Sequence, residues 1–177
     1  MRTTAYNVVA AVALVTTGCH AYEPYPATPS TEAARALNEL KTLPSYEDTM
    51  AEVQAAIDEI VATTSKIAPT ITWETPEEGS SGNCEAPYEQ TDGQRYFLPH
   101  HVGVGAQLSE SDWAAILDAT QHAAAKIGAT GMQVMQDQPG FHDVWFSGPT
   151  GIFIKVSYKG NLVVSGYTGC RLPRDRK

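Results

Sequence analysis

The N-terminal nineteen residues place the strongest constraint on this chain. Residues 1–7 carry one positive charge, Arg2, and no acid, and residues 8–15 are eight uncharged apolar residues. A basic start, a short apolar core and a small-residue end form a secretory signal. The apolar run is far shorter than the ~20 residues that a membrane-spanning helix needs. Residues 1–18 are therefore predicted to direct export and to be removed, so that the remaining chain folds outside the cytoplasm.

The end of this signal, residues 14–19, reads Leu-Val-Thr-Thr-Gly-Cys and resembles a bacterial lipobox. Thr16 stands where Leu is usual. In such signals the thiol is joined to diacylglycerol, the peptide is cut before the cysteine, and the new amine can be acylated. Two or three acyl chains hold a protein to a membrane that one chain binds only marginally. The resemblance implies a lipid anchor on Cys19 at the extracytoplasmic face of the cell membrane. The alternative is an ordinary signal peptide with an incidental cysteine.

Length and charge limit the domain count and the class of partner. Cleavage before Cys19 leaves 159 of the 177 residues, which suits one domain plus a tether. Residues 19–170 contain 7 basic and 19 acidic residues, whereas residues 171–177 contain four basic residues and one acid. An acidic body disfavours nucleic acid as a partner, because nucleic acid binding needs a basic surface. The basic end is interpreted as a frayed soluble tail, with contact to anionic lipid headgroups as the alternative.

Cys84 and Cys170 remain once Cys19 is assigned to the lipid. An even pair of cysteines in an exported chain predicts a disulfide. The chain-entropy model assigns roughly 4–5 kcal/mol to a bond that closes a loop of this length. The alternative is a pair of thiols that bind a metal, but no further ligand has the usual spacing. No metal or other cofactor is predicted.

Proline and apolar periodicity divide the mature chain. Residues 19–31 contain three prolines and no apolar periodicity, which predicts a semi-extended tether. Apolar residues at helical spacing predict a short helix over 32–42, a longer helix from 45 to the proline at 69, and a third over 108–127. The second and third of these are the strongly amphipathic helices.

The remaining apolar runs predict strands. The first two are 70–74 and 95–105, the latter interrupted near Pro99, with the polar stretch 75–94 between them as a loop. Four more runs, separated by turn residues, lie at 130–137, 142–147, 151–158 and 161–169. Short connections make antiparallel hairpins. The fold predicted for residues 32–170 is α+β, a two-layer sandwich in which an antiparallel sheet of five to six strands packs against two amphipathic helices.

The order of these segments resembles that of the mycobacterial lipoproteins of the LppA, LppB and LppV family, over residues 43–172 and at the lipobox. The residues that carry the resemblance are Pro44-Ser45-Tyr46-Glu47, Thr72-Trp73, Cys84, Leu108-Ser109-Glu110-Ser111-Asp112-Trp113, the run 124–130, and Gly169-Cys170. The resemblance implies an extracytoplasmic, lipid-anchored α+β domain with one disulfide. It implies no established enzymatic activity and no known ligand.

Catalytic motifs are missing from the sequence, which has no Gly-x-Ser-x-Gly elbow, no His-Glu-x-x-His and no phosphate loop. If a catalytic site assembles only in the fold, its candidates are His100, His101, Asp143 and Ser165. The two adjacent histidines are expected to point to opposite faces of a strand and not to bind one metal together. Other polar candidates are interpreted as structural: His142 as a polar residue at the entry to a strand, His122 and Asp118 as a surface pair, and Glu77-Glu78 as part of a solvated loop.

Nine aromatic residues occur at strand and helix spacing and are interpreted mainly as core. An apolar pocket or a carbohydrate platform is the alternative for any that the fold leaves exposed. They are Trp73, Trp113, Trp145, Tyr96, Phe97, Phe141, Phe146, Phe153 and Tyr158.

An anchor, a spacer and a compact disulfide-bonded domain without a catalytic motif favour a non-enzymatic binding or interaction domain of the cell envelope. Its partner would be an envelope protein, a lipid or a glycan. One alternative is a small extracytoplasmic hydrolase or transferase. The other is a purely structural or antigenic surface protein.

Overall fold

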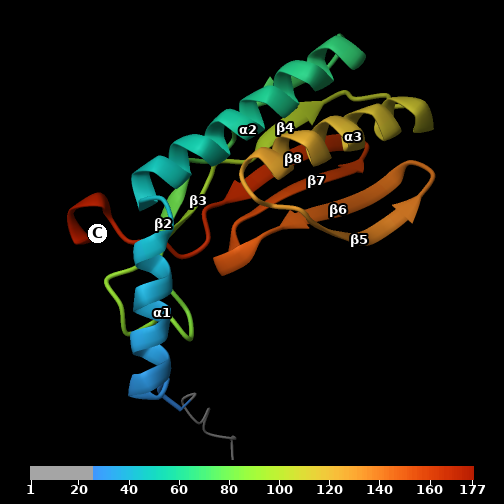
Figure 1. Ribbon diagram of the computed structural model, residues 1–177. Helices are drawn as coiled ribbons and strands as arrows, with labels where there is room; N and C mark the ends of the chain where they lie inside the picture. Colours follow the sequence, from blue (N-terminus) through green and yellow to red (C-terminus); the bar gives the residue numbers. More distant parts are fainter. Residues whose placement is uncertain (1–25) are drawn as a thin grey trace, which may run out of the picture.

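The computed structural model describes residues 26–177 (Figure 1), so Cys19 and most of the predicted tether lie outside the described residues. The helices are α1 (Ser30–Thr42), α2 (Tyr46–Ile67) and α3 (Glu110–Lys126), with short 3-10 turns η1 (Pro149–Gly151) and η2 (Arg174–Arg176). The strands are β1 (Thr72–Glu74), β2 (Ser80–Asn83), β3 (Gln94–Phe97), β4 (His101–Val104), β5 (Gly131–Gln138), β6 (Phe141–Ser147), β7 (Phe153–Lys159) and β8 (Asn161–Tyr167). None of the described helices is both long and apolar enough to cross a membrane.

Serine caps begin the two long helices. At the start of α2, Ser45 Oγ accepts a hydrogen bond from the Asp48 N–H (3.1 Å). At the start of α3, the Asp112 N–H donates to Ser109 Oγ (3.1 Å) and the Ser109 N–H donates to Asp112 Oδ2 (3.0 Å). The Ser109 hydroxyl (2.6 Å) and the Ser109 N–H both donate to Asp112 Oδ2, and these two hydrogen bonds hold the pKa of Asp112 below its ordinary value. Because each cap fixes the first turn, it also fixes which residues of the helix face the sheet.

All strand pairs are antiparallel, and six strands form one path in the order β1-β4-β8-β7-β6-β5. β3 joins this sheet at β8 through the pair Phe97↔Tyr167, and β2 pairs with β3. α2 and α3 lie side by side over one face of the sheet (Figure 1). The fold is therefore the two-layer α+β arrangement that the sequence predicts.

The sheet has eight strands, which is more than the predicted five to six. The predicted strand 95–105 is divided into β3 and β4 around Pro99, because proline has no N–H to donate to a strand ladder. β2 lies within the predicted loop 75–94. Its sequence, Ser-Ser-Gly-Asn, has no apolar alternation, and it is a strand because all four of its residues pair with β3.

Alternate residues of β6, β7 and β8 point toward the helices, on what we call the inner face, and form the main core. Completely buried side chains of this core include Val53, Ile57, Ile116, Phe146, Ile154 and Leu162. Gly166 of β8 lies directly beneath α2, where an added Cβ would be 2.6 Å from Val53 Cγ1 and 2.9 Å from Ile57 Cδ1. Because glycine has no side chain, α2 packs closer to the sheet here than a larger residue would allow.

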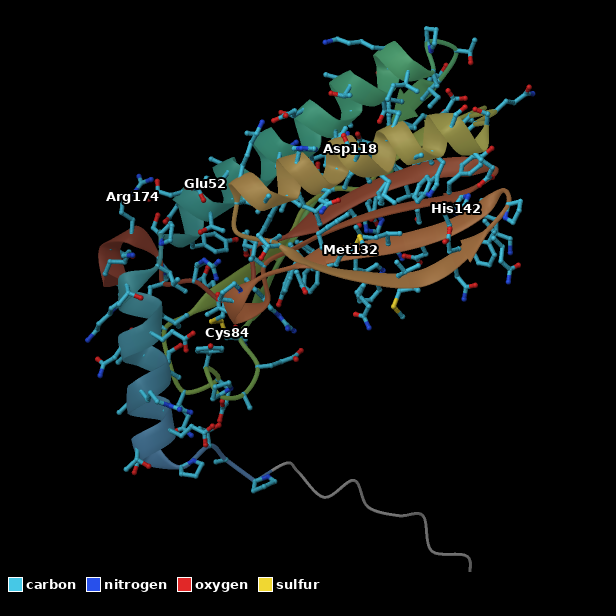
Figure 2. The ribbon with its side chains drawn as sticks, turned by 45° about the vertical axis from the view of Figure 1, so that its right-hand side comes forward. Glu52, Cys84, Asp118, Met132, His142 and Arg174 are labelled. Carbon is cyan, nitrogen blue, oxygen red and sulfur yellow. A yellow bond between two sulfur atoms is a disulfide. The ribbon has the colours of Figure 1, made fainter. Side chains whose placement is uncertain are left out.

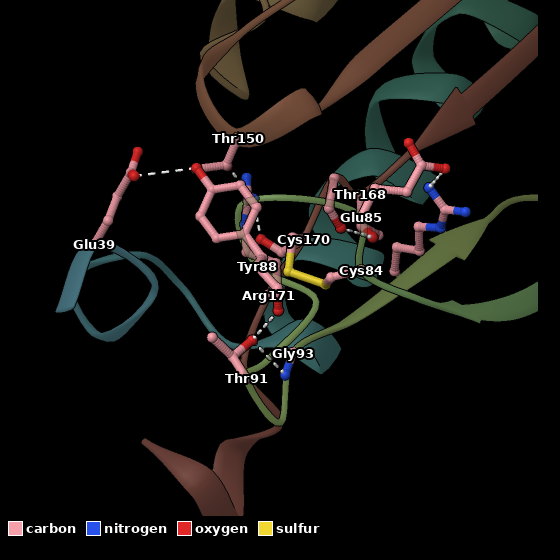
Figure 3. The surroundings of a disulfide bond; sticks show 12 residues. Glu39, Cys84, Glu85, Tyr88, Thr91, Gly93, Thr150, Thr168, Cys170 and Arg171 are labelled. Atoms are coloured by element: carbon pink, nitrogen blue, oxygen red, sulfur yellow. Dashed lines mark hydrogen bonds and ion pairs between the residues drawn. A yellow bond between two sulfur atoms is a disulfide. The ribbon is translucent and has the colours of Figure 1, made fainter. Parts of the chain in front are cut away.

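A second apolar cluster joins α1 to the C-terminal segment through the disulfide. Cys84 and Cys170 are bonded, with their Cα atoms 5.6 Å apart across 86 residues of sequence (Figure 3). Leu40 of α1 and Leu172 pack with the two cysteines, and all four residues are buried. This cluster, and not the main core, holds α1 against the rest of the domain.

The domain begins before residue 31, where the sequence predicts the tether to end. Thr28 is buried, its N–H donates to Glu89 Oε1 (3.0 Å), and its carbonyl oxygen accepts from Gln90 Nε2 (2.6 Å). The hydrogen bonds from Thr28 lower the pKa of Glu89 to about 2. The segment from Thr28 onward is therefore bonded to the 84–90 loop and is part of the fold.

The first residue of the basic C-terminal segment, Arg171, is buried and is not part of a frayed tail. Arg171 is 4% exposed, and it exchanges two backbone hydrogen bonds with Gln94, of 2.8 and 2.9 Å. Its guanidinium donates from Nε to Thr49 Oγ1 (3.1 Å) and from Nη1 to the carbonyl oxygen of Cys170 (2.7 Å). Burial holds the pKa of Arg171 below its usual value. The sequence interpretation is wrong here because composition counts charges but does not show the hydrogen bonds that a buried arginine makes.

The double substitution Cys84→Ala with Cys170→Ala is expected to lower the free energy of unfolding by about 2–5 kcal/mol, because the bond restricts a long loop in the unfolded chain. Urea denaturation of the full chain measures this change. Cys19→Ala, which removes a thiol outside the described fold, is the matched control. If the double variant were as stable as the control, packing alone would hold the second cluster.

Candidate functional site

The four residues considered for a catalytic site are not brought together. His101 of β4 is paired with the buried Val164 and so shares the inner face, whereas Asp143 of β6 and Ser165 of β8 point to the opposite face. His100 instead forms an exposed ion pair with Glu77, with 2.8 Å between Nδ1 and Oε1. Within residues 26–177, no hydrogen bond joins any two of the four candidates.

The other polar candidates lie mainly on the surface. His122 and Asp118, one helical turn apart on α3, form an exposed pair with 3.4 Å between Nδ1 and Oδ2. In the described part of the chain, no group of three or more histidine, cysteine, aspartate or glutamate residues could hold a metal ion.

His142 is buried, unlike the other histidines of the described chain (Figure 2). Its ring stacks on Trp113, with centroids 4.5 Å apart and planes 10° apart. Its Nδ1 lies 3.0 Å from Asp137 Oδ1 and its Nε2 lies 3.3 Å from Glu110 Oε2. Glu110 Oε1 also accepts a hydrogen bond from the Gly140 N–H (3.1 Å). Because the two carboxylates meet opposite nitrogens, they do not converge on one ion. They connect the β5–β6 turn to the start of α3.

His142→Ala is expected to lower the free energy of unfolding by about 2–4 kcal/mol, because it removes the stacking on Trp113 and leaves a cavity where a buried ring packs. His142→Phe keeps an aromatic ring and is expected to recover part of the loss. Urea denaturation of both variants measures the two contributions. Wild-type stability for His142→Ala would contradict this structural role.

The aromatic residues divide between the two faces of the sheet. Trp113, Phe146 and Tyr158 are buried in the main core, as the sequence indicates. Others point to the face opposite α2 and α3, which we call the open face, where Trp145 and Phe153 are only half-buried. Tyr167, Arg95 and Lys155, which the sequence analysis did not single out, also lie on this face.

Four rings from four strands form a continuous row across the open face. Phe97 stacks on Tyr167 (centroids 4.6 Å apart), Tyr167 contacts Phe153 (5.6 Å), and Phe153 stacks on Trp145 (5.7 Å). The first three residues lie directly opposite one another in the strand register, and Trp145 lies diagonally across from Phe153. We call these four residues the aromatic row.

Cationic side chains cover both ends of the aromatic row. The Arg95 guanidinium lies 5.5 Å from the centre of the Phe97 ring, and Lys155 Nζ lies 5.3 Å from the centre of the Trp145 ring. Lys155 also pairs with Asp143 (2.9 Å), and Asp143 accepts the Trp145 Nε1–H (2.7 Å). The row is therefore fixed by its neighbours and is not a set of independently moving side chains.

A small pocket of about 240 Å³ opens beside Tyr167 of the row, next to the disulfide. Arg95 and Tyr167 form part of its wall, and Tyr88 and Thr150 form another part (Figure 3). Arg95 is paired here with Glu85 (2.7 Å), which raises the pKa of the arginine. The pocket extends the aromatic row to the 84–90 loop.

Comparison with known proteins decides the family. The sequence profile of the LppA family, described as a lipoprotein confined to pathogenic Mycobacterium, matches residues 21–174. The chain belongs to the LppA family. Among proteins with curated descriptions, none matches the sequence.

Two solved structures are similar to this family member. The crystal structure of LppA from Mycobacterium tuberculosis has a TM-score of 0.63 and 18% identity, over 82% of this chain and 89% of that chain. A DUF4853 family protein from Actinomyces odontolyticus has a TM-score of 0.48 and 14% identity, over 87% of this chain and 73% of that chain. The likeness to LppA shows a shared fold.

Proposed function

We propose that this lipoprotein is a non-enzymatic binding module of the cell envelope, anchored through a lipid on Cys19, which holds a partner protein against the aromatic row. Membership of a lipoprotein family supports the anchor. So does the lipobox-like stretch 14–19, which lies outside the described residues. The observation that carries the binding proposal is the aromatic row itself, set on a sheet face that neither long helix covers.

The composition and shape of the open face favour a protein partner. Tryptophan, tyrosine, phenylalanine and arginine are the residues enriched at the centres of protein interfaces. All four types occur within the row and its capping residue Arg95, and Phe97 is 42% exposed. Small-molecule sites are concave, whereas the row crosses the face of a sheet.

The orientation of the rings argues against a carbohydrate platform. A sugar packs its C–H groups on the electron-rich face of an aromatic ring. Here the ring faces at Phe97–Tyr167 and at Phe153–Trp145 are directed at one another, with interplanar angles of 28° in both pairs. Arg95 and Lys155 lie over the two terminal rings. The row therefore offers mainly ring edges, which suit apolar side chains and carboxylates.

The charge of the open face differs from that of the whole protein, which has a net charge of −8. Arg95, Lys155 and Lys159 all lie on this face, although residues 19–170 contain only seven basic residues. Lys159 lies over the Phe141 ring (4.6 Å) and forms no ion pair with the described residues. Glu85 and Asp143 neutralise Arg95 and Lys155, so the chemistry of the face fits a mainly apolar partner segment with an acidic side chain that meets Lys159.

Cys19→Ala is expected to abolish incorporation of a palmitate analogue and to move the protein from the membrane fraction to the soluble fraction, because one cysteine carries the whole anchor. Metabolic labelling of the full chain in its native type of host measures both effects. Cys84→Ala with Cys170→Ala is the matched control and should stay labelled. Unchanged labelling of Cys19→Ala would overturn the anchor.

Trp145→Ala with Phe153→Ala is expected to weaken partner binding by about 30-fold or more, since a central interface residue contributes about 2 kcal/mol or more. A photoreactive residue placed at Ser157, on the open face of β7, would capture the partner in intact cells. The same group at Gln121, exposed on α3, is the control position.

Support for the proposal would be a product formed at Ser157 and lost in the double variant, with the far-ultraviolet circular dichroism unchanged. A product that forms equally at Gln121, or that persists in the double variant, would contradict it. Gln121→Ala serves as the control substitution and should leave capture unaffected.

A further inference from the structure

The β5 strand forms a free edge of the sheet. It pairs with β6 on one side, through seven residue pairs, and no strand of residues 26–177 pairs with its other side (Figure 1). Alternate residues of such an edge direct their N–H and C=O groups outward. The edge at the opposite end of the path, β1, has only three residues, whereas β5 has eight. β2, which pairs only with β3, is a third edge of four residues, so β5 is the longest edge open to another strand in the described chain.

The side chains of β5 do not protect this edge. Natural edge strands are commonly blocked by lysine, proline or inward-pointing charges. β5 contains no lysine, arginine or proline, and its one charged residue, Asp137, is engaged with His142. Met132, Val134 and Met135 are 53%, 49% and 45% exposed, and they are three of the four large hydrophobic residues that the described chain exposes most. The bulge at Met135 is the only common protective device on this strand.

Met132 and Val134 are apolar residues on a part of the sheet that no helix covers. They lie opposite Phe146 and Val144, which are buried on the inner face, so both point to the helix side of the sheet. α3 contacts β7 and β6, and β5 lies beyond it, on the side of the sheet farthest from α2 (Figure 2). The two apolar residues thus stand on the core side of the sheet without a helix above them.

We propose that β5 pairs antiparallel with β5 of a second copy of this chain, about a two-fold axis at Gln133. In this register Met132 of each copy lies opposite Val134 of the other, so four apolar side chains meet on the inner face between the two α3 helices. The two copies thereby contribute the same surface patch to the interface, as a two-fold axis requires. The paired strands continue one sheet through both copies.

Charge does not oppose a second copy at this edge. Two copies with a net charge of −8 each repel one another over most of their surface. In the proposed register the two Asp137 residues are separated by eight residues of strand, roughly 25 Å at ~3.3 Å per residue. That separation exceeds the Debye length of about 8 Å at physiological ionic strength, so their repulsion is screened. β5 is thus a place where two copies approach with little charge opposition.

Cysteine crosslinking tests the register directly. Residues that face one another across the two-fold axis have Cα atoms about 4.5–5.5 Å apart, within the range that a disulfide spans. Mild oxidation of full-length Gln133→Cys in membranes is therefore expected to shift most of the protein to a covalent dimer on a non-reducing gel. Gln136→Cys, also exposed on the same strand, places its thiol far from the same thiol of the other copy and is expected to stay monomeric.

A strand pair this short buries less than the ~1,600 Å² of a standard interface. We therefore expect weak self-association, which crosslinking can trap. Adding Val134→Lys to Gln133→Cys is expected to remove the dimer. Adding Thr72→Lys, which places a lysine on the edge strand β1, is expected to leave the amount of dimer unchanged. Equal crosslinking at positions 133 and 136, a dimer that survives Val134→Lys, or a product with another protein identified by mass spectrometry would overturn the proposal. Dimer loss confined to Val134→Lys would support it. These readouts do not depend on the aromatic row.

Discussion

Side-chain alternation along β6, β7 and β8 is the constraint on which the rest of the structure depends. Even-numbered residues such as Val144, Ile154 and Val164 face α2 and α3, and odd-numbered residues such as Trp145, Phe153 and Tyr167 face away. A slip of one residue in any strand would exchange the two sets. Core packing on one face and ring stacking on the other therefore specify the same register, and the aromatic row is as closely tied to the fold as the core is.

The disulfide cluster connects α1 to the centre of the sheet. α1, the first described helix, is held through Leu40 and the bonded pair Cys84–Cys170, and Cys170 comes three residues after the end of β8. β8 is a central strand that pairs with β3, β4 and β7. α1 is thus connected to the middle of the sheet and not to one of its edges.

Local signals in the sequence were sufficient for the fold class, and long-range partners were not visible in them. Serine caps and apolar periodicity place α2 and α3, and turn residues separate β5 to β8. β2 has no pattern of its own and exists through β3. Arg171 is buried because its guanidinium bonds Thr49, 122 residues away in sequence.

Strand alternation in the sequence is enough to predict part of the open face. Once Val156 and Leu162 are assigned to the core, a period of two places Lys155 and Tyr167 on the other face. His101 and Asp143 are on opposite faces of the sheet, because His101 is paired with the inward-facing Val164 and Asp143 alternates with the inward-facing Val144. The stacking order across four strands needed the pairing of β3 with β8 as well, and no local pattern predicts that pairing.

The widths of the two layers explain why the helices leave β5 uncovered. Six strands about 4.8 Å apart occupy roughly 24 Å from first to last, whereas two packed helices lie about 8–10 Å apart and cover roughly 20 Å. The hydrogen bond from Trp73 to Ser65 (2.9 Å) holds β1 under α2, so the helix layer is aligned with that side. The strand that the narrower helix layer fails to cover is then β5, so Met132 and Val134 are on the core side of the sheet without a helix above them.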